Sequence, residues 1–517
     1  MHKPYKTFGH RSGSKQAEKP PRLQLMVHRL LYISNVLPSM RPPNISSTKK
    51  PTKGPKATAI FDTFGNNPLR EPFSITLAGE EVYVVVNPND VAQVYKNNTS
   101  LSFDVFVQDL MLSCGTDTRT VEKMSEEPPR YIPGRNDSSL NPSGKSLVRL
   151  AVDFHHIQLL PGPNSQAGPL IDVLLGHIKR GLAWETLSQG ECLGSQKSSK
   201  GIQVSLLGLC GRVLVEAGTK TYWGDKLWGL TPDMLKSFYA LDRGVWKLLF
   251  QYPSVFSRDA LAARDTIIDI LTQYYRLPRE EREDCAWFTK SLETESRNLG
   301  LGESDMSAAI LIIFFVVNGN TYKFCFWVLC HLLSDPSLYA SVKKEVFLEN
   351  RTDGPSLEHL TNKCPILDSV LSEVLRLYSS SASMRYITED TLIGGKILRK
   401  GRKIMLPYRQ LHENQDVFGN DFSKFRPTRF IEKRNLTRSS SYRPFGGGAT
   451  LCAGRFVARQ EVLCFIGTAL HQYDIERLED PNDIPRFPRV DSAKPTFGIM
   501  APLEGDDLRV YITPKNM

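Results

Sequence analysis

The chain has 517 residues, of which 41% are apolar and 23% are charged. This ordinary globular composition excludes a collagen-like, disordered or low-complexity chain. Lysine and arginine outnumber aspartate and glutamate by 65 to 55. Because no nucleic-acid-binding motif accompanies this excess, we expect a membrane surface or an acidic protein as partner, and no nucleic acid. The nine cysteines include no C-x-x-C pair, which argues against a disulfide framework or zinc ribbon and favours a reduced, cytosol-facing protein.

The N-terminal part of the chain differs in composition from the rest. Residues 1–60 are predicted to be a basic, proline-rich leader, and residues 61–517 one continuous domain. The apolar segment 23–37 is too short to span a membrane, and it includes His28 and Arg29. It also lacks the cleavage site of a signal peptide. We therefore expect either an interfacial helix or an ordinary leader here.

The hydrophobic pattern predicts a mainly α fold with a minor β portion (α+β). In chain order it indicates a strand pair over 75–86, a helix from 91 that is capped by residues 87–90, a long loop over 115–148, helices over 165–350, short strands over 392–406, loops over 407–450, a helix over 453–471 and a hairpin over 495–514.

The longest apolar run, 308–333, is long enough to cross a membrane. Three polar residues, Asn318, Asn320 and Lys323, would then lie near the middle of the bilayer, which is costly. A buried core helix that carries polar groups for a functional reason fits the run better than a membrane span.

A glycine-rich segment, FGGGATLCAGR, precedes a predicted helix and contains Cys452. Glycines allow a tight turn and a close approach to a flat ligand. At a helix N-terminus the pKa of a thiol is lowered, and a thiolate is a soft axial ligand for haem iron. The segment lacks the Lys-Ser/Thr ending of a phosphate-binding loop. A structural buried cysteine is the remaining alternative.

Two further motifs precede this segment. Glu373 and Arg376 are three residues apart in a helical stretch, so they lie on one face, and their apolar neighbours favour burial. A buried pair of this kind needs additional partners, which Arg429 in the sequence FRPTRF can supply.

The order of Glu-x-x-Arg, Phe-x-Pro-x-Arg-Phe and Phe-x-x-Gly-x-x-x-Cys-x-Gly resembles the cytochrome P450 haem-thiolate family over roughly residues 60–517. The resemblance implies the P450 fold, with a long distal helix over haem b and a proximal loop that carries the cysteine. It implies that Cys452 is the axial iron ligand and that Glu373, Arg376 and Arg429 form a structural network. The haem-binding residues expected from the resemblance are Cys452, Phe445, Gly448, Gly454, Arg385 and Arg443. Thr450 stands where relatives usually have a basic residue that reaches a haem propionate, so Arg385 or Arg443 is expected to make that contact.

The resemblance places residues 317–321 over the haem, where many relatives have an acid followed by threonine. Thr321 is kept, and Asn320 replaces the acid. An amide does not titrate as a carboxylic acid does, but it can orient water. We therefore expect Thr321 and Asn320 to be the catalytic pair. The Asn-Thr pair is similar to the branch of sterol 7-alpha-hydroxylases and prostacyclin synthase, which contains both monooxygenases and oxygen-independent isomerases.

The resemblance implies a monooxygenase that uses O₂ and takes electrons from NADPH through NADPH-cytochrome P450 reductase. The style of the sequence resembles fungal enzymes of secondary metabolism, so a terpenoid, sterol-like or polyketide substrate is expected. An oxygen-independent isomerase or dehydratase, or a non-catalytic haem protein, is the alternative. We expect the protein at the endoplasmic reticulum, facing the cytosol, without a transmembrane helix. The expected pocket residues are Asn318, Gly319, Ser383, Met384, Gly498 and Ile499.

Overall fold

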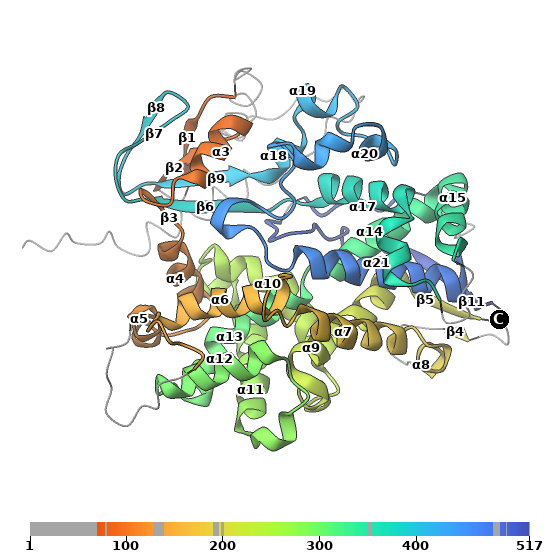
Figure 1. Cartoon of the computed structure of the whole chain (residues 1–517), viewed down its shortest axis with the longest axis horizontal. Coiled ribbons are helices and arrows are strands. Elements are labelled where there is room, and N and C mark those ends of the chain that lie inside the picture. Colours follow the sequence, from red (N-terminus) through yellow and green to blue (C-terminus); the bar gives the residue numbers. More distant parts are fainter. Residues whose placement is uncertain are drawn as a thin grey trace, which may run out of the picture.

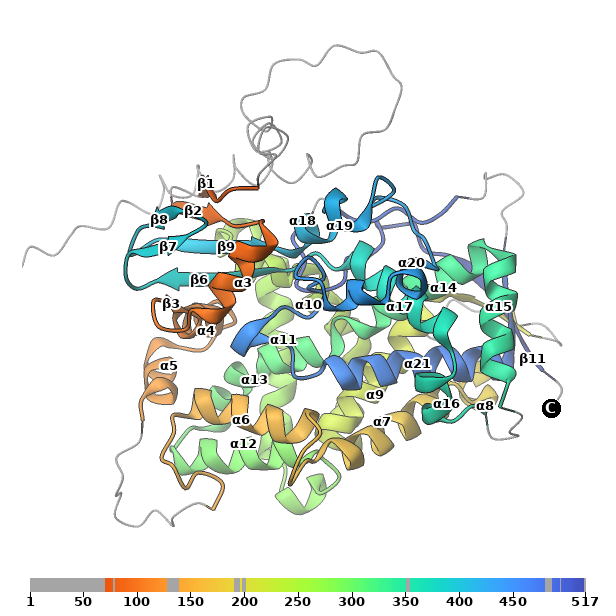
Figure 2. The same ribbon diagram turned by 45° about the horizontal axis from the view of Figure 1, so that its top comes forward.

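The structure, a computed structural model, describes residues 70–77, 80–127, 139–189, 196–197, 201–349, 354–478, 486–492 and 494–515. Helices fill most of the molecule, and the larger sheet lies at one end (Figures 1 and 2). The predicted mainly α fold with a minor β portion is confirmed. The predicted leader at 1–60, with its apolar segment 23–37, lies outside the described residues.

Four helices from distant parts of the chain pack together in the interior. They are α7 (Ala167–Gly181), α9 (Leu206–Gly229), α14 (Thr321–Ser334) and α21 (Arg455–Gln472). Helix α14 is apolar on nearly all sides, and Phe326 and Trp327 have no exposed surface. A helix of this composition is stable only when neighbouring helices cover every face.

The remaining long helices surround this centre. Helix α10 (Met234–Leu249) packs on α11 (Arg258–Arg276), which packs on α13 (Glu303–Asn318), while α12 (Trp287–Asn298) packs on α6 (Leu147–Leu159). The remaining α-helices of the described residues are α3 (Pro88–Lys96), α4 (Asp104–Ser113), α5 (Thr118–Ser125), α8 (Trp184–Gln189), α15 (Pro336–Phe347), α16 (Leu357–Asn362), α17 (Pro365–Tyr378), α18 (Tyr408–His412), α19 (Gln415–Phe418) and α20 (Arg429–Glu432).

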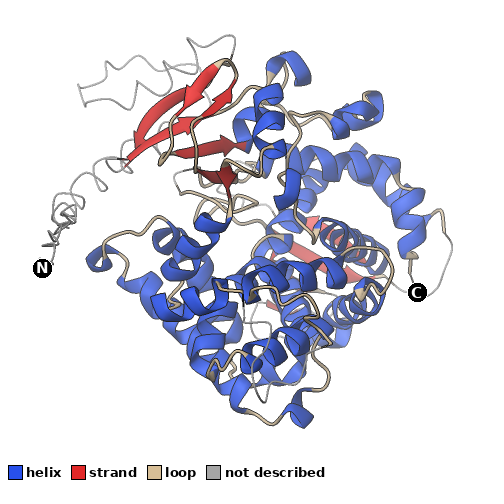
Figure 3. Cartoon of the chain, turned by 60° about the vertical axis from the view of Figure 1, so that its left-hand side comes forward, coloured by secondary structure: helices blue, strands red, loops and turns tan. Residues whose placement is uncertain are grey.

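The larger sheet, red at the upper left of Figure 3, has the strand order β1-β2-β9-β6-β3. These strands are β1 (Phe73–Leu77), β2 (Glu80–Val84), β3 (Leu101–Ser102), β6 (Ala382–Ile387) and β9 (Lys403–Pro407). The predicted strand pair at 75–86 is the antiparallel pair β1-β2. A hairpin of β7 (Thr391–Ile393) and β8 (Lys396–Leu398) turns at Gly394 and Gly395, which both have positive φ, as this type of turn requires.

The predicted hairpin over 495–514 is wrong. Strand β11 (Arg509–Pro514) pairs on one side with β10 (Tyr473–Arg477) and on the other with β5 (Ile202–Ser205), and β4 (Gln196–Lys197) completes this second sheet. Among the described residues of 486–508 there are only isolated β-bridges. The apolar alternation of β11 is real, but its partners lie outside 495–514, more than 30 residues away in β10 and about 300 residues away in β5, which local pattern does not reveal.

The predicted loop over 115–148 is wrong in part, because α5 occupies Thr118–Ser125 and α6 begins at Leu147. The missed signal is the N-cap of α5, where the side chain of Asp117 accepts a hydrogen bond from the backbone N–H of Thr120 at 3.1 Å. The predicted helix cap within 87–90 is confirmed at Asn87, the N-cap of α3, although the helix begins at Pro88 and not at residue 91.

The apolar run at 308–333 is one long helix interrupted at residues 319–320, between α13 and α14. It is the one described helix long and apolar enough to cross a membrane, but 67% of its most apolar window is buried inside the fold. Lys323 forms an ion pair with Asp242 of α10 at 2.8 Å, and Tyr322 donates to the same carboxylate at 2.7 Å. The polar residues of the run therefore have partners within the protein, as a core helix requires.

Candidate functional site

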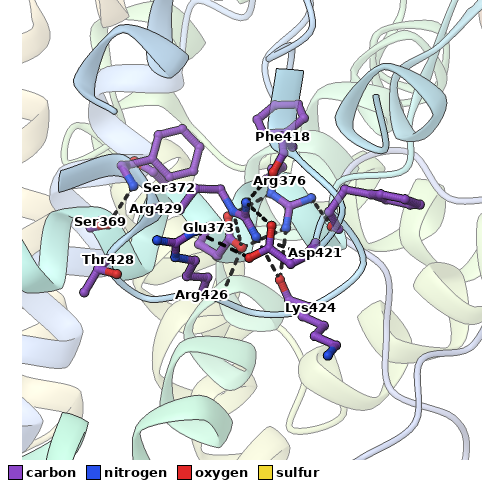
Figure 4. Close-up of polar contacts among 12 residues, drawn as sticks. Ser369, Ser372, Glu373, Arg376, Phe418, Asp421, Lys424, Arg426, Thr428 and Arg429 are labelled. Carbon is purple, nitrogen blue, oxygen red and sulfur yellow. Dashed lines mark hydrogen bonds and ion pairs between the residues drawn. The ribbon is translucent and has the colours of Figure 1, made fainter. Parts of the chain in front are cut away.

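Three charged side chains from two distant parts of the chain meet in the interior (Figure 4). Glu373 and Arg376 lie one turn apart on α17, and the guanidinium of Arg376 donates to both carboxylate oxygens, at 2.7 and 2.8 Å. Arg429, at the start of α20, donates from Nε to Glu373 Oε1 at 3.0 Å. The side chains of Glu373 and Arg376 have no exposed surface. The structure thus brings together the three residues that the sequence analysis grouped.

The remaining donors of these arginines bind backbone carbonyls and, in the case of Arg429 Nη1, also the carboxylate of Asp421 at 3.0 Å. Arg376 donates to the carbonyl of Phe422 at 2.6 Å, and Arg429 donates to that of Phe418 at 2.6 Å. A buried ion pair is stable only when its other hydrogen-bonding groups are also satisfied. The network therefore fixes the loop-rich segment 412–429 against α17.

His412, the first residue of this segment, connects it to the glycine-rich loop. Burial, aided by the charge of Arg376, lowers the pKa of His412 to about 3, so the imidazole is neutral. Its Nε2 accepts a hydrogen bond from the backbone N–H of Arg443 at 2.9 Å. The buried network and the loop that carries Cys452 are in this way one connected structure.

Cys452 lies between a glycine-rich turn and helix α21. Gly446 and Gly448 have φ of +78° and +60°, which residues with a side chain rarely adopt. A Cβ atom on Gly448 would lie 2.8 Å from the carbonyl oxygen of Tyr95, so the loop packs directly on α3. The backbone N–H of Cys452 donates to the carbonyl of Phe445 at 3.0 Å and closes the loop. These contacts fix where the cysteine leaves the turn.

The side chain of Cys452 is exposed, whereas the seven other cysteines of the described chain are buried. Desolvation raises the pKa of the Cys452 thiol, although the N–H groups of Gly454 and Arg455 and the charge of Arg455 act in the opposite direction. The predicted lowering of the Cys452 pKa by the helix N-terminus is therefore wrong for the protein alone, because desolvation of the thiol outweighs it. An accessible sulfur near two backbone N–H groups nevertheless has the chemistry of a soft metal ligand.

Arg385 lies beside the same loop, on β6. Its guanidinium donates to Thr450 Oγ1 at 2.5 Å and to Ser383 Oγ at 2.7 Å. The residue is 4% exposed, and no carboxylate of the described chain forms an ion pair with it. A buried cation without an anion is costly, so this position suits an acidic group of a ligand. Arg443 is close by, with its guanidinium 5.8 Å from the ring of Tyr95.

Thr321 is the first residue of α14, and its hydroxyl donates to Glu461 Oε1 at 2.9 Å. Glu461 lies on α21, nine residues after Cys452, and burial raises its pKa to about 8. The sequence analysis missed Glu461. Its signal was a single acid in the apolar stretch EVLCFIGTAL, where burial of a carboxyl group needs a specific reason.

The other predicted site residues lie in three places. The Nδ2 of Asn318 donates to the carbonyl of Phe314, and its Oδ1 lies against Gly218 of α9, so this side chain faces α9. Gly319 and Asn320 occupy the break between α13 and α14, and Asn320 Oδ1 accepts a hydrogen bond from the backbone N–H of Ile499. Ser383, Met384, Gly498 and Ile499 lie on β6 and in the segment after residue 493.

The sequence was compared with known proteins. Residues 229–500, more than half of the chain, match the family described as Cytochrome P450. The chain is 26% identical to Cytochrome P450 monooxygenase poxD of Penicillium oxalicum over 430 residues, 78% of this chain and 80% of the relative. It is 28% identical to Abscisic acid 8'-hydroxylase CYP707A1 of Solanum lycopersicum (48% and 53%) and 25% identical to Cytochrome P450 7A1 of Sus scrofa (58% and 64%). The chain therefore belongs to the cytochrome P450 family of haem-dependent monooxygenases, which use O₂ and electrons from a redox partner.

Proposed function

We propose that this cytochrome P450 binds haem b through Cys452 and oxidises a bulky, apolar small molecule of the terpenoid, sterol or polyketide kind. The observation that carries the proposal is the accessible sulfur of Cys452, held by a glycine-rich loop beside a buried cation without an anionic partner among the described residues. A thiolate ligand and a carboxylate-bearing macrocycle match these two features. NADPH, through a cytochrome P450 reductase, is the proposed electron source.

The residues around the loop have separate roles in this proposal. Cys452 binds the iron, and the bond from its N–H to Phe445 fixes the direction of its side chain. Arg385 and Arg443 hold the haem propionates, because Thr450 stands at the position where relatives usually have a basic residue for this contact. Gly448 and Gly454 leave room for the macrocycle beside the loop. When bound, the haem supplies the activation of O₂, and the protein contributes positioning and control of water and protons.

Thr321 and Glu461 are the proposed proton-handling groups. Asn320 does not titrate, whereas Glu461 holds a proton near neutral pH and contacts the Thr321 hydroxyl. A carboxyl group with a pKa close to the working pH both holds and releases protons, which suits general acid catalysis. Asn320 remains part of the proposed catalytic pair because it is the residue directly before Thr321.

The proposed substrate class rests on exposed apolar side chains near the break in the distal helix. Helices α4 and α13 contact each other, and Val105, Leu112 and Val316 expose 37%, 40% and 49% of their surfaces. Exposed apolar side chains on two helices that contact each other favour an apolar ligand. The Solanum relative is named for hydroxylating abscisic acid, also a small organic molecule. Membrane association at the endoplasmic reticulum is part of the proposal, and it rests on the basic leader.

The carbon monoxide difference spectrum of the reduced protein tests the central point. We expect a red-shifted, thiolate-type Soret band in the natural protein and in the control Cys464→Ala, since Cys464 is a buried cysteine farther along α21. The band should disappear in Cys452→Ala. A band that survives in Cys452→Ala contradicts the assignment of the ligand.

The alternative reaction, isomerisation or dehydration of a peroxide, needs neither NADPH nor O₂. Turnover of a panel of terpenoids and sterols with NADPH, reductase and ¹⁸O₂ separates the two reactions. Incorporation of one ¹⁸O atom into the product supports a monooxygenase. Conversion of an organic peroxide without NADPH and without incorporation supports the isomerase.

A further inference from the structure

The segment 497–500, named here the C-terminal loop, is held in place by several backbone hydrogen bonds. The carbonyl of Gly498 accepts from the N–H of Ser380, and the N–H of Met500 donates to the carbonyl of Tyr378, both at 2.9 Å. The indole N–H of Trp327, on α14, donates to the carbonyl of Met500 at 2.7 Å. One side of the loop is thus fixed to the end of α17, and its last residue is fixed to α14.

Asn320 provides a further contact, within the loop, directly before Met500. Its side-chain Oδ1 accepts the backbone N–H of Ile499 at 2.9 Å. Gly498 has a φ of +134°, and a Cβ atom at this position would lie 2.0 Å from Asn320 Oδ1. The absence of a side chain at residue 498 is therefore required for the amide to reach the backbone of the loop.

Asn320 lies at the break in the distal helix, directly before Thr321. Its backbone conformation (φ −120°, ψ −44°) belongs to neither α13 nor α14. Asn318, two residues earlier, keeps its side chain within the helical core, with its Nδ2 bound to the carbonyl of Phe314. Of these two amides, only that of Asn320 connects the distal helix to the C-terminal loop.

The position of the C-terminal loop also affects α10. The ring of Phe497 lies 6.2 Å from that of Phe250, the residue that follows α10, measured between ring centroids. A shift of the loop relative to α14 would therefore also change the packing at the end of α10.

We propose that Asn320 is a positioning residue that determines substrate selectivity, because its side chain fixes the C-terminal loop to the break in the distal helix. This inference rests on the proposed function, since it concerns the substrate side of the same haem site. The amide does so as a neutral acceptor for a backbone N–H, and the interaction therefore does not depend on pH. It gives the residue that replaces the family's acid a role separate from proton transfer.

Hydrogen–deuterium exchange of the haem-loaded enzyme, resolved to the Ile499 amide, tests the contact directly. Asn320→Ala removes the acceptor, and we expect exchange at Ile499 to rise about fivefold or more, as the loss of one hydrogen bond predicts. Asn320→Asp keeps an acceptor oxygen and should retain the protection. Asn318→Ala is the matched control, because it removes an amide from the same helix without touching the loop.

Spectral titration with two azoles tests the consequence for selectivity. Imidazole is small, and its dissociation constant should stay within about twofold in Asn320→Ala, whereas that of the bulky clotrimazole should rise about fivefold, because only the larger ligand reaches the loop. The carbon monoxide spectrum is recorded for each variant. A normal thiolate band in Asn320→Ala shows that the haem site is intact, so a failure of this inference is distinguishable from a failure of the proposed function.

Three results would overturn the inference. Unchanged exchange at Ile499 in Asn320→Ala would show that the contact does not hold the loop. Equal changes for imidazole and clotrimazole would show that the residue acts on the haem side and not on selectivity. An increase in peroxide release without either change would assign Asn320 to the orientation of water instead.

Discussion

The hydroxyl of Thr321 donates a hydrogen bond to the carboxyl group of Glu461 at 2.9 Å and so joins α14 to α21. Thr321 follows the break in the distal helix, and Glu461 is on the helix that follows the Cys452 loop. A titratable acid is therefore in contact with Thr321 although residue 320 is an amide. Tyr222 of α9, Cys325 of α14 and Cys464 of α21 are near this carboxyl group, and each has a pKa raised chiefly by burial. These neighbours stay neutral where Glu461 titrates.

Glu461→Gln should abolish a buried carboxyl group that titrates near pH 8. In the natural protein we expect a protonated C=O band in the infrared difference spectrum at pH 6 that is lost by pH 9. The variant should show no such band, should still bind haem, and should release more peroxide per NADPH consumed because proton supply to the site is impaired. A band that persists unchanged in Glu461→Gln would assign it to another acid.

The same group makes stability depend on pH. Burial raises the folded-state pKa of Glu461 to about 8, above its ordinary value, so the folded protein keeps a proton that the unfolded chain releases. Stability from this group should therefore fall as pH rises between about 4.5 and 8, by at most on the order of 5 kcal/mol. Denaturation at several pH values should give a smaller decrease for Glu461→Gln. Parallel pH profiles of the two proteins would contradict the raised pKa.

Arg429→Ala should prevent stable haem loading. It leaves the buried Glu373 with one fewer cation, and removal of one partner from a buried ion pair costs about 3–5 kcal/mol. Arg426→Ala is the matched control three residues earlier, because its side chain pairs with Glu432 at the surface while only its backbone N–H contacts Glu373. Thermal unfolding and haem content should change in the first variant and stay unchanged in the second. Equal effects would show that the position of the segment matters and not the buried charge.

Lys323→Met should destabilise the protein more than the double variant Lys323→Met/Asp242→Asn. The single change leaves the carboxylate of Asp242 in a largely buried place without its cation, whereas the double change removes both charges. We expect a loss of about 3 kcal/mol or more for the single variant, measured by denaturant unfolding, and a partial recovery in the double variant. The exposed pair Lys226–Glu281 serves as control, and its removal should have little effect. An additive double variant would show that the two charges do not interact.

Arg385→Ala should weaken haem retention without unfolding the protein. If Arg385 holds a propionate, the variant should lose haem to apomyoglobin about tenfold faster or more, since a hydrogen bond to a charged group is worth about 1.5–3 kcal/mol. Arg399→Ala is the control, because Arg399 forms an exposed ion pair with Asp390 near the same sheet. An unchanged rate of haem loss would remove Arg385 from the haem site.

Part of the site could be predicted from the sequence because its signals are local. The glycines before Cys452 and the three-residue spacing of Glu373 and Arg376 depend only on backbone geometry over a few residues. The burial of Lys323 was also foreseen, because a charged residue in an apolar run must find a partner within the protein.

Tertiary structure alone decided which distant groups meet. The pairing of β11 with β5, the contact of Glu461 with Thr321 and the contact of Asn320 with Ile499 join segments separated by 140 residues or more. A local pattern indicates that a buried polar group needs a hydrogen-bond partner. It does not identify the partner, because burial and hydrogen bonding depend on how the helices pack. For the same reason the pKa of the Cys452 thiol could not be predicted from its place at a helix terminus. The sequence by itself determined the family, the cysteine loop and the buried charges, and the packing of α14 against α21 and the C-terminal loop determined the partners of Thr321 and Asn320.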